Sequence, residues 1–266
     1  MKKEFCFTID DNIRFLKEIS ERGYASIFEH PYLKMLKELH RKHSLAIQLN
    51  LFYECEGFNL CQMKNEYRDE WDACADWLRL SFHSRCENVA PYKNAPYGEV
   101  FRDCEAVQGE ILRFASPRSL ARTTTLHYCE ATEEGVRALY DSGVRGLLGL
   151  YGSEEEPSIS YNTSEEDARL LRCGATLERG DMYYAGIDLI VNKLNREQAL
   201  CRLGTLLGRP LIKVMIHEQY FYPDYERHQP DFEDKLDAVF SYLSSAGYTS
   251  TFFEEVMTGE KKKQSY

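Results

Sequence analysis

The 266-residue sequence has no run of about 18 uninterrupted apolar residues, the length that a membrane-spanning helix needs. Even the apolar segment LIKVMIH carries Lys213 and His217. The N-terminal segment MKKEFCFTIDD reaches Asp10 and Asp11 after too few apolar residues to form the core of a secretion signal. We therefore expect a cytoplasmic protein without a membrane partner.

Basic residues are also scarce, with 33 Lys and Arg against 43 Asp and Glu and a net charge of −10. A chain with this balance is a poor match for the phosphate backbone, so we expect no nucleic-acid partner. The nine cysteines form no CxxC pair, which argues against a zinc knuckle or a thioredoxin-like motif and favours reduced, structural thiols.

Short segments rich in β-branched or aromatic residues alternate with longer segments of helical period, and no low-complexity linker divides them. This order favours a parallel sheet whose strands are joined by helices. The segments 153–162 and 164–174 are irregular. Strands are predicted at 4–10, 44–53, 78–84, 123–130, 145–152, 182–194, 211–221 and 248–256, and helices at 27–43, 66–77, 97–114, 133–143, 196–208 and 230–247.

Seven or eight strands separated by helices are what a closed α/β barrel needs, and an open doubly wound sheet is the alternative. We expect one such domain over residues 1–258, followed by a flexible C-terminal tail at 259–266.

Alternate residues of a strand point to opposite sides, and in several predicted strands one of the two rows is polar. Burying unpaired polar groups costs about 1–3 kcal/mol each, so a polar row indicates a wet, ligand-binding centre. In barrels the carboxyl ends of the strands carry the chemistry. The polar residues expected to meet there are Asp10, Asn50, His83, His127 and His217.

Asp10 and Asp11 end the first predicted strand, where one carboxylate can bind a metal while the other acts as a base. In the alternative, Asp11 caps a following helix. His83 and Glu87 lie four residues apart, which brings an imidazole and a carboxylate to one side of a helical turn or tight loop. Such ligands suit Zn²⁺ or Mn²⁺, and a simple hydrogen bond between the two is the alternative.

His217 ends a late strand, where a histidine can serve as a general acid or pack as a satisfied core residue. His127 and Asp188 lie on other strands, where they would hold substrate hydroxyl groups or support the residues that do so. Asn50 is expected to contact substrate as well.

The motifs TIDD at 8–11, HSRCE at 83–87 and IKVMIH ending at His217 resemble, in order and spacing, those of the polysaccharide deacetylase-like (NodB-type) family. The resemblance implies a distorted (β/α)7–8 barrel that uses a divalent metal to remove acetyl groups from sugars. It also implies roles for individual residues: Asp10 as general base, His217 as general acid, and Asp11 and His83 as metal ligands. Glu87 stands where the family has a second histidine, so the third ligand would be a carboxylate.

Two further departures mark a divergent branch. Asn12 stands where the family has glycine, and the sequence has no convincing counterpart of the family's arginine-bearing substrate motif. We expect a metal-dependent hydrolase that acts on the amide or ester bond of a small acetylated carbohydrate or related compound.

Two alternatives remain. One is an inactive barrel that binds a sugar or peptide on Tyr92, Tyr97, Tyr151 and Tyr161. The other is a metal-dependent phosphoesterase, which the shortage of clustered Lys and Arg near the motifs disfavours.

Overall fold

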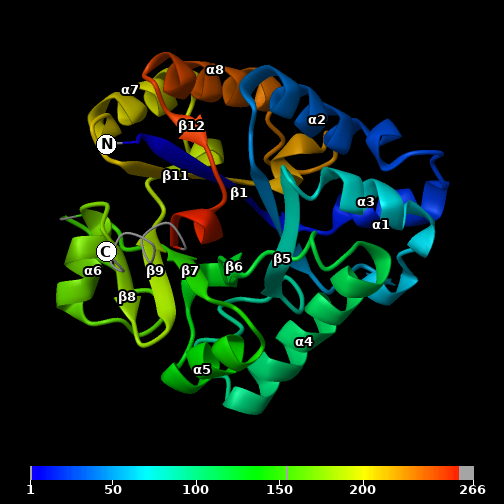
Figure 1. Ribbon diagram of the computed structural model, residues 1–266, viewed down its shortest axis with the longest axis horizontal. Helices are drawn as coiled ribbons and strands as arrows, with labels where there is room; N and C mark the ends of the chain where they lie inside the picture. Colours follow the sequence, from blue (N-terminus) through cyan, green and yellow to red (C-terminus); the bar gives the residue numbers. More distant parts are fainter. Residues whose placement is uncertain (1, 154, 258–266) are drawn as a thin grey trace.

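The computed structural model describes residues 2–153 and 155–257, and its strands form two sheets surrounded by helices (Figure 1). The first sheet has the order β10-β11-β1-β2-β5, with all neighbours parallel, and β12 also pairs with β1. Its strands are β1 (Glu4–Asn12), β2 (Ile47–Phe52), β5 (Leu78–Ser84), β10 (Leu189–Ile190), β11 (Leu211–His217) and β12 (Thr249–Ser250).

The second sheet has the order β6-β7-β9-β8, in which only β8 runs antiparallel to its neighbour. Its strands are β6 (Thr123–Thr124), β7 (Gly146–Gly149), β8 (Thr176–Arg179) and β9 (Met182–Gly186). A short hairpin of β3 (Glu54–Cys55) and β4 (Phe58–Asn59) stands apart from both sheets.

The two sheets adjoin at both edges. At one edge, the Leu80 N–H donates to Ser119 O, and the Leu80 carbonyl accepts from Ala121 N. At the other edge, the segment that carries β9 and β10 changes partner, because Ile187 N donates to the β7 residue Gly149 and Asp188 N donates to the β11 residue Lys213. Seven strand positions therefore follow one another around a distorted α/β barrel, as predicted.

Helices α1 to α8 lie outside the strands, with α2, α7 and α8 along one side and α4 and α5 along the other (Figure 1), and residues 253–257 are also helical. Helix α4 matches its predicted range, whereas α1 lies outside every predicted range and α6 forms in a segment expected to be irregular. The helices are α1 (Arg14–Arg22), α2 (Pro31–His43), α3 (Arg68–Cys74), α4 (Tyr97–Phe114), α5 (Glu133–Asp141), α6 (Glu165–Arg172), α7 (Arg196–Leu206) and α8 (Phe232–Ser245). Among the 3-10 turns are η4 (His127–Cys129), η5 (Val191–Lys193) and η6 (Glu218–Phe221).

The two rows of β1 face different surroundings, as the alternation of its sequence predicts. Phe5 and Phe7 pack on Phe240 of α8, with ring centroids 5.7 and 4.8 Å apart. On the opposite side, the Asp10 carboxylate accepts a hydrogen bond from Asn50 of β2. The apolar core therefore lies between strands and helices, and the polar row lies inside the barrel.

Polar residues inside the barrel satisfy one another. Gln48 donates to Asn50 and to the Thr123 carbonyl, and the Thr123 hydroxyl donates back to Gln48. Each of these residues is almost completely buried, so the bonds offset the cost of removing the groups from water.

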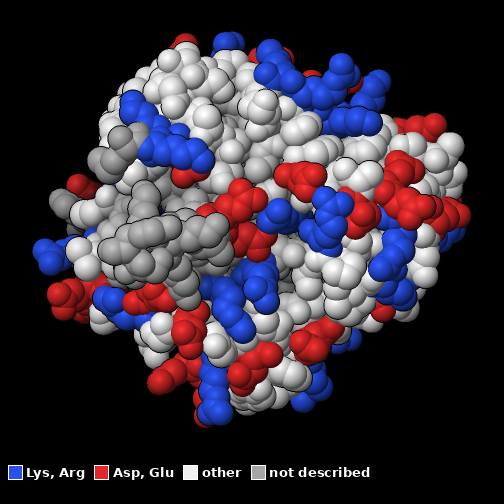
Figure 2. Space-filling model, viewed as in Figure 1, with Lys and Arg blue, Asp and Glu red and all other residues white. Residues whose placement is uncertain are grey.

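The surface of the face shown in Figure 2 carries acidic and basic side chains that intermingle, without one dominant basic patch. No helix within the described ranges is long and apolar enough to cross a membrane. All nine cysteines lie in the described ranges, and none of them forms a disulfide there. The predicted tail at 259–266 lies outside the described residues.

Candidate metal centre and active site

The end of β1 departs from regular strand geometry, and this departure places two consecutive carboxylates in one pocket. The register between β1 and β2 shifts between Ile9 and Asn12, and Asp11 adopts a left-handed backbone conformation with φ of 61°. Aspartate is one of the few non-glycine residues that tolerates this conformation. In a regular strand Asp10 and Asp11 would point to opposite sides, but here both line the same pocket.

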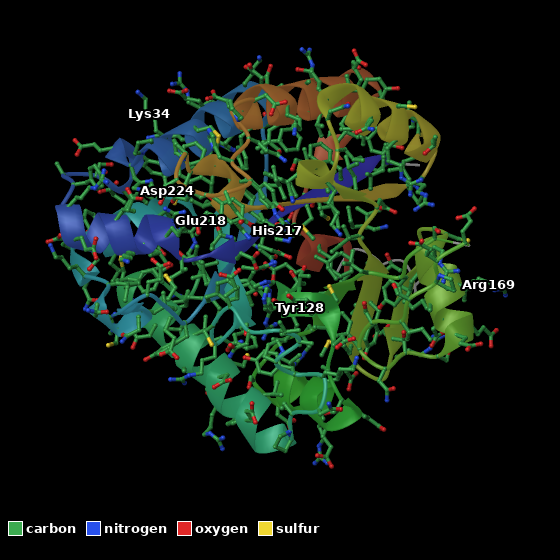
Figure 3. All side chains as sticks on the ribbon, turned by 180° about the vertical axis from the view of Figure 1, so that it is seen from behind. Lys34, Tyr128, Arg169, His217, Glu218 and Asp224 are labelled. Atoms are coloured by element: carbon green, nitrogen blue, oxygen red, sulfur yellow. The ribbon has the colours of Figure 1, made fainter. Side chains whose placement is uncertain are left out.

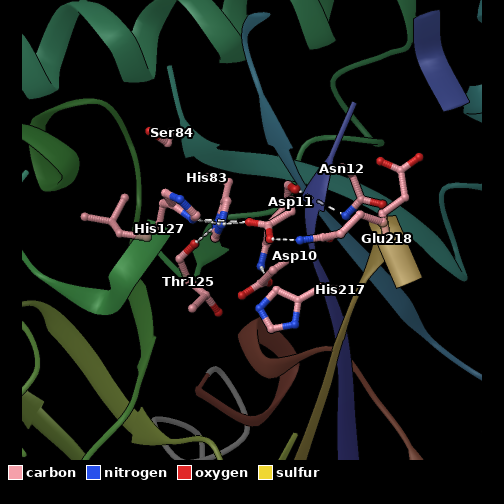
Figure 4. Close-up of polar contacts among 12 residues, drawn as sticks. Asp10, Asp11, Asn12, His83, Ser84, Thr125, His127, His217 and Glu218 are labelled. Carbon is pink, nitrogen blue, oxygen red and sulfur yellow. Dashed lines mark hydrogen bonds and ion pairs between the residues drawn. The ribbon is translucent and has the colours of Figure 1, made fainter. Parts of the chain in front are cut away.

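Asp11 belongs to a three-residue group with His83 and His127, whose ligand atoms all lie within 4.8 Å of one another (Figure 4). Asp11 Oδ1 lies 3.0 Å from His83 Nε2 and 3.2 Å from His127 Nδ1. The two ring nitrogens lie 3.2 Å apart. The side chains are 2% exposed for His83, 8% for Asp11 and 11% for His127, so water contributes little to this cluster.

The protonation of His83 decides what this group can hold. Its Nδ1 lies 2.5 Å from the Thr125 carbonyl oxygen, which can only accept, so Nδ1 carries a proton. In neutral His83 the Nε2 lone pair then faces a carboxylate oxygen and a second imidazole nitrogen. A proton on His83 Nε2 or a cation among the three atoms relieves the repulsion between them, and one carboxylate with two imidazoles is a donor set that suits a divalent metal.

The environment favours the charged form of Asp11. Burial raises the pKa of Asp11, but hydrogen bonds from His127 and His83 outweigh burial and hold its pKa well below the ordinary value. The second oxygen, Oδ2, accepts a 2.6 Å hydrogen bond from Gln219. Burial lowers the pKa of His83, but the negative charges of Asp10 and Asp11 raise it by more than burial lowers it. The pKa of His83 therefore lies above the ordinary value.

Asp10 lies beside the three-residue group but makes no part of it. Its Oδ1 accepts a 2.6 Å hydrogen bond from Asn50 Nδ2. Burial raises the pKa of Asp10, and the nearby histidines His83 and His217 reduce this effect without reversing it. A carboxylate with a raised pKa is a stronger base than an exposed aspartate.

His217 lines the same pocket from the end of β11, which pairs with β1 so that His217 stands opposite Asp10. Its Nδ1 lies 2.9 Å from Asn192 Oδ1, and this contact orients the ring. Burial lowers the pKa of His217, although both aspartates act in the opposite direction. Its protonated form is therefore a stronger acid than an exposed imidazolium.

Helix α1 takes its N-terminal cap from Glu218 rather than from Asp11. The Glu218 carboxylate accepts from the backbone N–H groups of Ile13, Arg14 and Phe15 at 2.7, 3.1 and 2.8 Å. The interpretation of Asp11 as a helix cap is therefore wrong, because its carboxylate is bonded to His83 and Gln219 instead. Glu218 also ties the end of β11 to the turn that follows Asp11.

The pocket above these residues has a volume of about 280 Å³ and an apolar wall beside its polar floor. Leu126, Leu150, Ile190 and Met215 form the apolar wall. A second groove, of about 550 Å³, shares Asp11, Glu87 and Gln219 with it and runs along α1. The site therefore opens into a longer surface groove.

The structure places four of the predicted site residues in other surroundings than the sequence predicted. Glu87 lines the pocket, but it is exposed and lies outside the Asp11–His83–His127 group, in which His127 takes the third place. Asn50 holds Asp10 and is fully buried. Asp188 is not among the residues that line the pocket. Its carboxylate instead accepts from Lys213 N and pairs with the side chains of Lys213 and Arg209.

The tyrosines proposed as a stacking surface are also unsuited to that role. Tyr92, Tyr151 and Tyr161 are 1–3% exposed, and Tyr97, the first residue of α4, donates to Asp141 at the end of α5 and does not line the pocket. The aromatic residues that do line the pocket are Tyr128 and Tyr220.

Comparison with protein-family profiles and with curated proteins gives no match. Solved structures do match. A 4-α-glucanotransferase from Thermococcus litoralis aligns over 97% of this chain with a TM-score of 0.64 and 14% identity, although the chain spans only 40% of the glucanotransferase. A Mycobacterium smegmatis protein assigned as a polysaccharide deacetylase aligns over 99% of this chain and 92% of its own, with a TM-score of 0.61 and 7% identity.

A peptidoglycan N-acetylglucosamine deacetylase aligns over 96% of this chain and 87% of its own length, with a TM-score of 0.52 and 10% identity. The fold is that of the polysaccharide deacetylases. This confirms the fold that the sequence motifs predict, and the low identities agree with a divergent branch. On this deacetylase fold, the buried Asp-His-His group lies at the carboxyl ends of β1 and β5 and in the turn after β6, the edge where barrels carry their chemistry.

Proposed function

We propose that this protein is a metal-dependent hydrolase that removes an acyl group, such as acetyl, from a carbohydrate. The observation that carries the proposal is the convergence of three electron-rich ligand atoms, from Asp11, His83 and His127, beside the buried pair Asp10 and His217. One carboxylate and two imidazoles with their ligand atoms within 4.8 Å of one another are a donor set that a divalent metal takes.

Asp11, His83 and His127 would hold a divalent cation, with Zn²⁺ and Mn²⁺ the ions that best suit the ligands. When bound, the cation supplies Lewis-acid polarisation of a carbonyl oxygen and lowers the pKa of water. The Thr125 carbonyl fixes the tautomer of His83, as is usual for a metal-binding histidine. Gln219 orients Asp11 in the same way.

Asp10 and His217 are placed to move protons on the two sides of the reaction. Asp10 would take a proton from the attacking water, and His217 would give one to the leaving amine or alcohol. Burial raises the pKa of Asp10 and lowers that of His217, so the two pKa values move toward each other. A base and an acid with pKa values near the working pH are the effective pair for such transfers.

The apolar wall of Leu126, Leu150, Ile190 and Met215 suits the methyl end of an acyl group. The carbohydrate part of the proposal rests on the fold, since one solved structure with this fold is a peptidoglycan N-acetylglucosamine deacetylase. The open groove along α1 leaves room for further sugar units.

The ligand set is tested by measuring the affinity for Zn²⁺ and Mn²⁺ by calorimetry in two single variants. His127→Ala is expected to weaken metal binding by at least about 10-fold, because it removes a buried ligand. Glu87→Ala is the matched control and is expected to stay within about 3-fold of the wild type, because Glu87 is exposed outside the group. The opposite result would restore Glu87 as the third ligand.

The reaction is tested by acetate release from tetra-N-acetylchitotetraose with the metal-loaded protein. Asp10→Asn is expected to lower turnover by about 100-fold or more and to leave metal affinity unchanged, because it removes the base and not a ligand. A wild-type protein that binds the sugar and the metal but releases no acetate contradicts the hydrolase and supports the alternative of an inactive, sugar-binding barrel.

A further inference from the structure

Tyr128 is exposed to an extent that is unusual for an aromatic residue in this protein. Within the described ranges, six large apolar residues are 37–82% exposed, and Tyr128, at 53%, is the only aromatic one among them. It is also the only one of the six that lines the pocket above the metal centre. Figure 3 labels it near His217, toward the middle of the molecule. An exposed apolar ring at the mouth of a site marks a contact surface for a ligand.

The backbone at Tyr128 is strained, and the strain is what turns the ring outward. Tyr128 and Cys129 have φ of 64° and 56°, so two consecutive non-glycine residues adopt the left-handed conformation. Such conformations cost about 1–3 kcal/mol each and persist where the surroundings impose them. With this turn, His127 faces the metal centre, Cys129 is buried, and Tyr128 points to the pocket mouth.

Several hydrogen bonds impose the turn. Cys129 N donates to Leu126 O at 2.7 Å, and Cys129 O accepts from Tyr161 N at 3.2 Å. The buried Tyr161 hydroxyl accepts from Leu126 N and donates to Leu148 O. The ring of Tyr128 is therefore presented by a rigid turn rather than by a loose loop.

The orientation of the ring is also fixed. It meets His127 edge to face, with ring centroids 4.6 Å apart and an interplanar angle of 76°. Tyr220 lines the pocket from η6 and stacks edge to face with Tyr225. A flat ligand held against Tyr128 would thus lie over the metal centre within an aromatic border.

We propose that Tyr128 is a specificity-determining residue, a stacking platform for the apolar face of the sugar ring that carries the acyl group. The inference rests on the proposed function, because it assumes that the substrate of this site is a carbohydrate. The C–H face of a pyranose ring fits an exposed aromatic face, and the hydroxyl edge of the sugar stays in water. Binding there places the acyl group toward Asp10 and the three ligands.

The test is calorimetric binding of tetra-N-acetylchitotetraose to the metal-loaded protein, in the Asp10→Asn background so that turnover does not consume the ligand. Tyr128→Ala is expected to weaken binding by about 5- to 10-fold, and Tyr128→Phe by less than about 2-fold, because the ring and not the hydroxyl makes the contact. Tyr97→Ala, which removes a tyrosine on α4 outside the pocket, is the matched control and is expected to have no effect. Tyr128→Leu replaces Tyr128→Ala if the latter does not fold.

An Asp10→Asn protein that binds no tetra-N-acetylchitotetraose, or a Tyr128→Ala variant in this background that binds it equally well, overturns the platform. A second readout separates the stacking role of Tyr128 from the proposed hydrolysis. It is acetate release from ethyl acetate, a substrate that has no sugar ring to stack on Tyr128. Tyr128→Ala could lose activity equally on ethyl acetate and on tetra-N-acetylchitotetraose. That result also overturns the platform, since it means that Tyr128 merely supports His127. Tyr128-dependent binding without acetate release from either substrate supports the platform and contradicts the hydrolase.

Discussion

His127 illustrates how a residue can be found from sequence while its role is not. Strand parity placed it in the polar row, at the same end as Asp10 and His83. The spacing of His83 and Glu87 suggested a local pair of ligands, because residues four apart meet on a helical turn. The structure has no helix there: the chain leaves β5 and Glu87 turns outward, while the turn at η4 brings His127 to within 3.2 Å of His83. That turn depends on two strained residues, which no propensity predicts.

At the same scale, Asn50 offers a test of how Asp10 is held. Asn50 Nδ2 donates to Asp10 at 2.6 Å, and Asn50 itself accepts from Gln48 at 2.7 Å. Asn50→Ala is expected to lower kcat on acetylated chitotetraose by about 10-fold and to leave KM and metal affinity within about 3-fold, because it misplaces the base without touching substrate. Steady-state kinetics distinguish this positioning role of Asn50 from the predicted role in substrate binding. In the latter, Asn50→Ala would raise KM and leave kcat unchanged. Asn88→Ala, in an exposed loop, is the control.

At the scale of elements, the sequence predicted the long helices and the strands β1, β2, β5 and β11 well, and the short or externally capped elements poorly. The strand predicted at 248–256 is a strand only at 249–250 and helical at 253–257, and the strand predicted at 123–130 ends at 124. Helix α4 has its own amphipathic pattern over Tyr97–Phe114 and was predicted with the same bounds. Helix α1 has no side-chain cap at Ile13 and no acidic residue in its first turn. Its cap, Glu218, lies more than 200 residues away along the chain. Because the stabilising group comes from another element, the local N-terminal signal at Asp11 points to the wrong residue for this cap.

The cap has a consequence for stability that can be measured. Burial raises the pKa of Glu218 from 4.5 to about 7, although hydrogen bonds from Tyr222 and the backbone oppose this. Between these pH values the unfolded chain ionises Glu218 before the folded protein does. The stability contribution of this residue is therefore fully present below pH 4.5 and decreases as the pH rises to 7, by about 3 kcal/mol in all.

Urea unfolding of the wild type and of Glu218→Gln between pH 4.5 and 8 measures this contribution. Glu218→Gln is expected to have nearly the wild-type stability at low pH, since a protonated carboxyl and an amide each keep one carbonyl oxygen to accept from the N–H groups that face it. It should also lose the decrease in stability between pH 4.5 and 7. Glu226→Gln, an exposed residue on the following segment, should keep the wild-type slope. Equal slopes in all three proteins would mean that Glu218 stays ionised throughout.

For the whole molecule, the barrel depends on how its two sheets are joined. The strand count and the alternation with helices predicted a barrel, and the fold shared with polysaccharide deacetylases agrees. The junction between the two sheets, called the seam here, could not be predicted from the sequence. It lies where the segment that carries β9 and β10 stops pairing with β7 and begins to pair with β11. Asp188 sits at this change of partner, in a position that looks, from alternation alone, like a site residue. Polar residues inside a barrel can hold it together as well as bind ligand.

Asp188 therefore provides the test of the seam. Its side chain is 3% exposed and faces Lys213, which is 2% exposed, at 2.8 Å, with Arg209 as a second partner. Asp188→Asn would leave the Lys213 ammonium buried without its counter-charge, which costs about 3–5 kcal/mol. We expect the free energy of unfolding in urea to fall by about that amount, and the double variant Asp188→Asn, Lys213→Met to recover much of it, because the second substitution removes the unpaired charge.

The same variant separates a structural role of Asp188 from the predicted role in substrate binding. If Asp188 acts at the seam, KM for acetylated chitotetraose, measured well below the unfolding temperature, stays within about 3-fold of the wild type while stability falls. If Asp188 binds substrate, the loss of a hydrogen bond to a charged group raises KM by about 10-fold or more, and the stability changes little. The first outcome is expected, because both carboxylate oxygens already have partners in the barrel wall and neither faces the pocket that Asp10, Asp11 and His217 line.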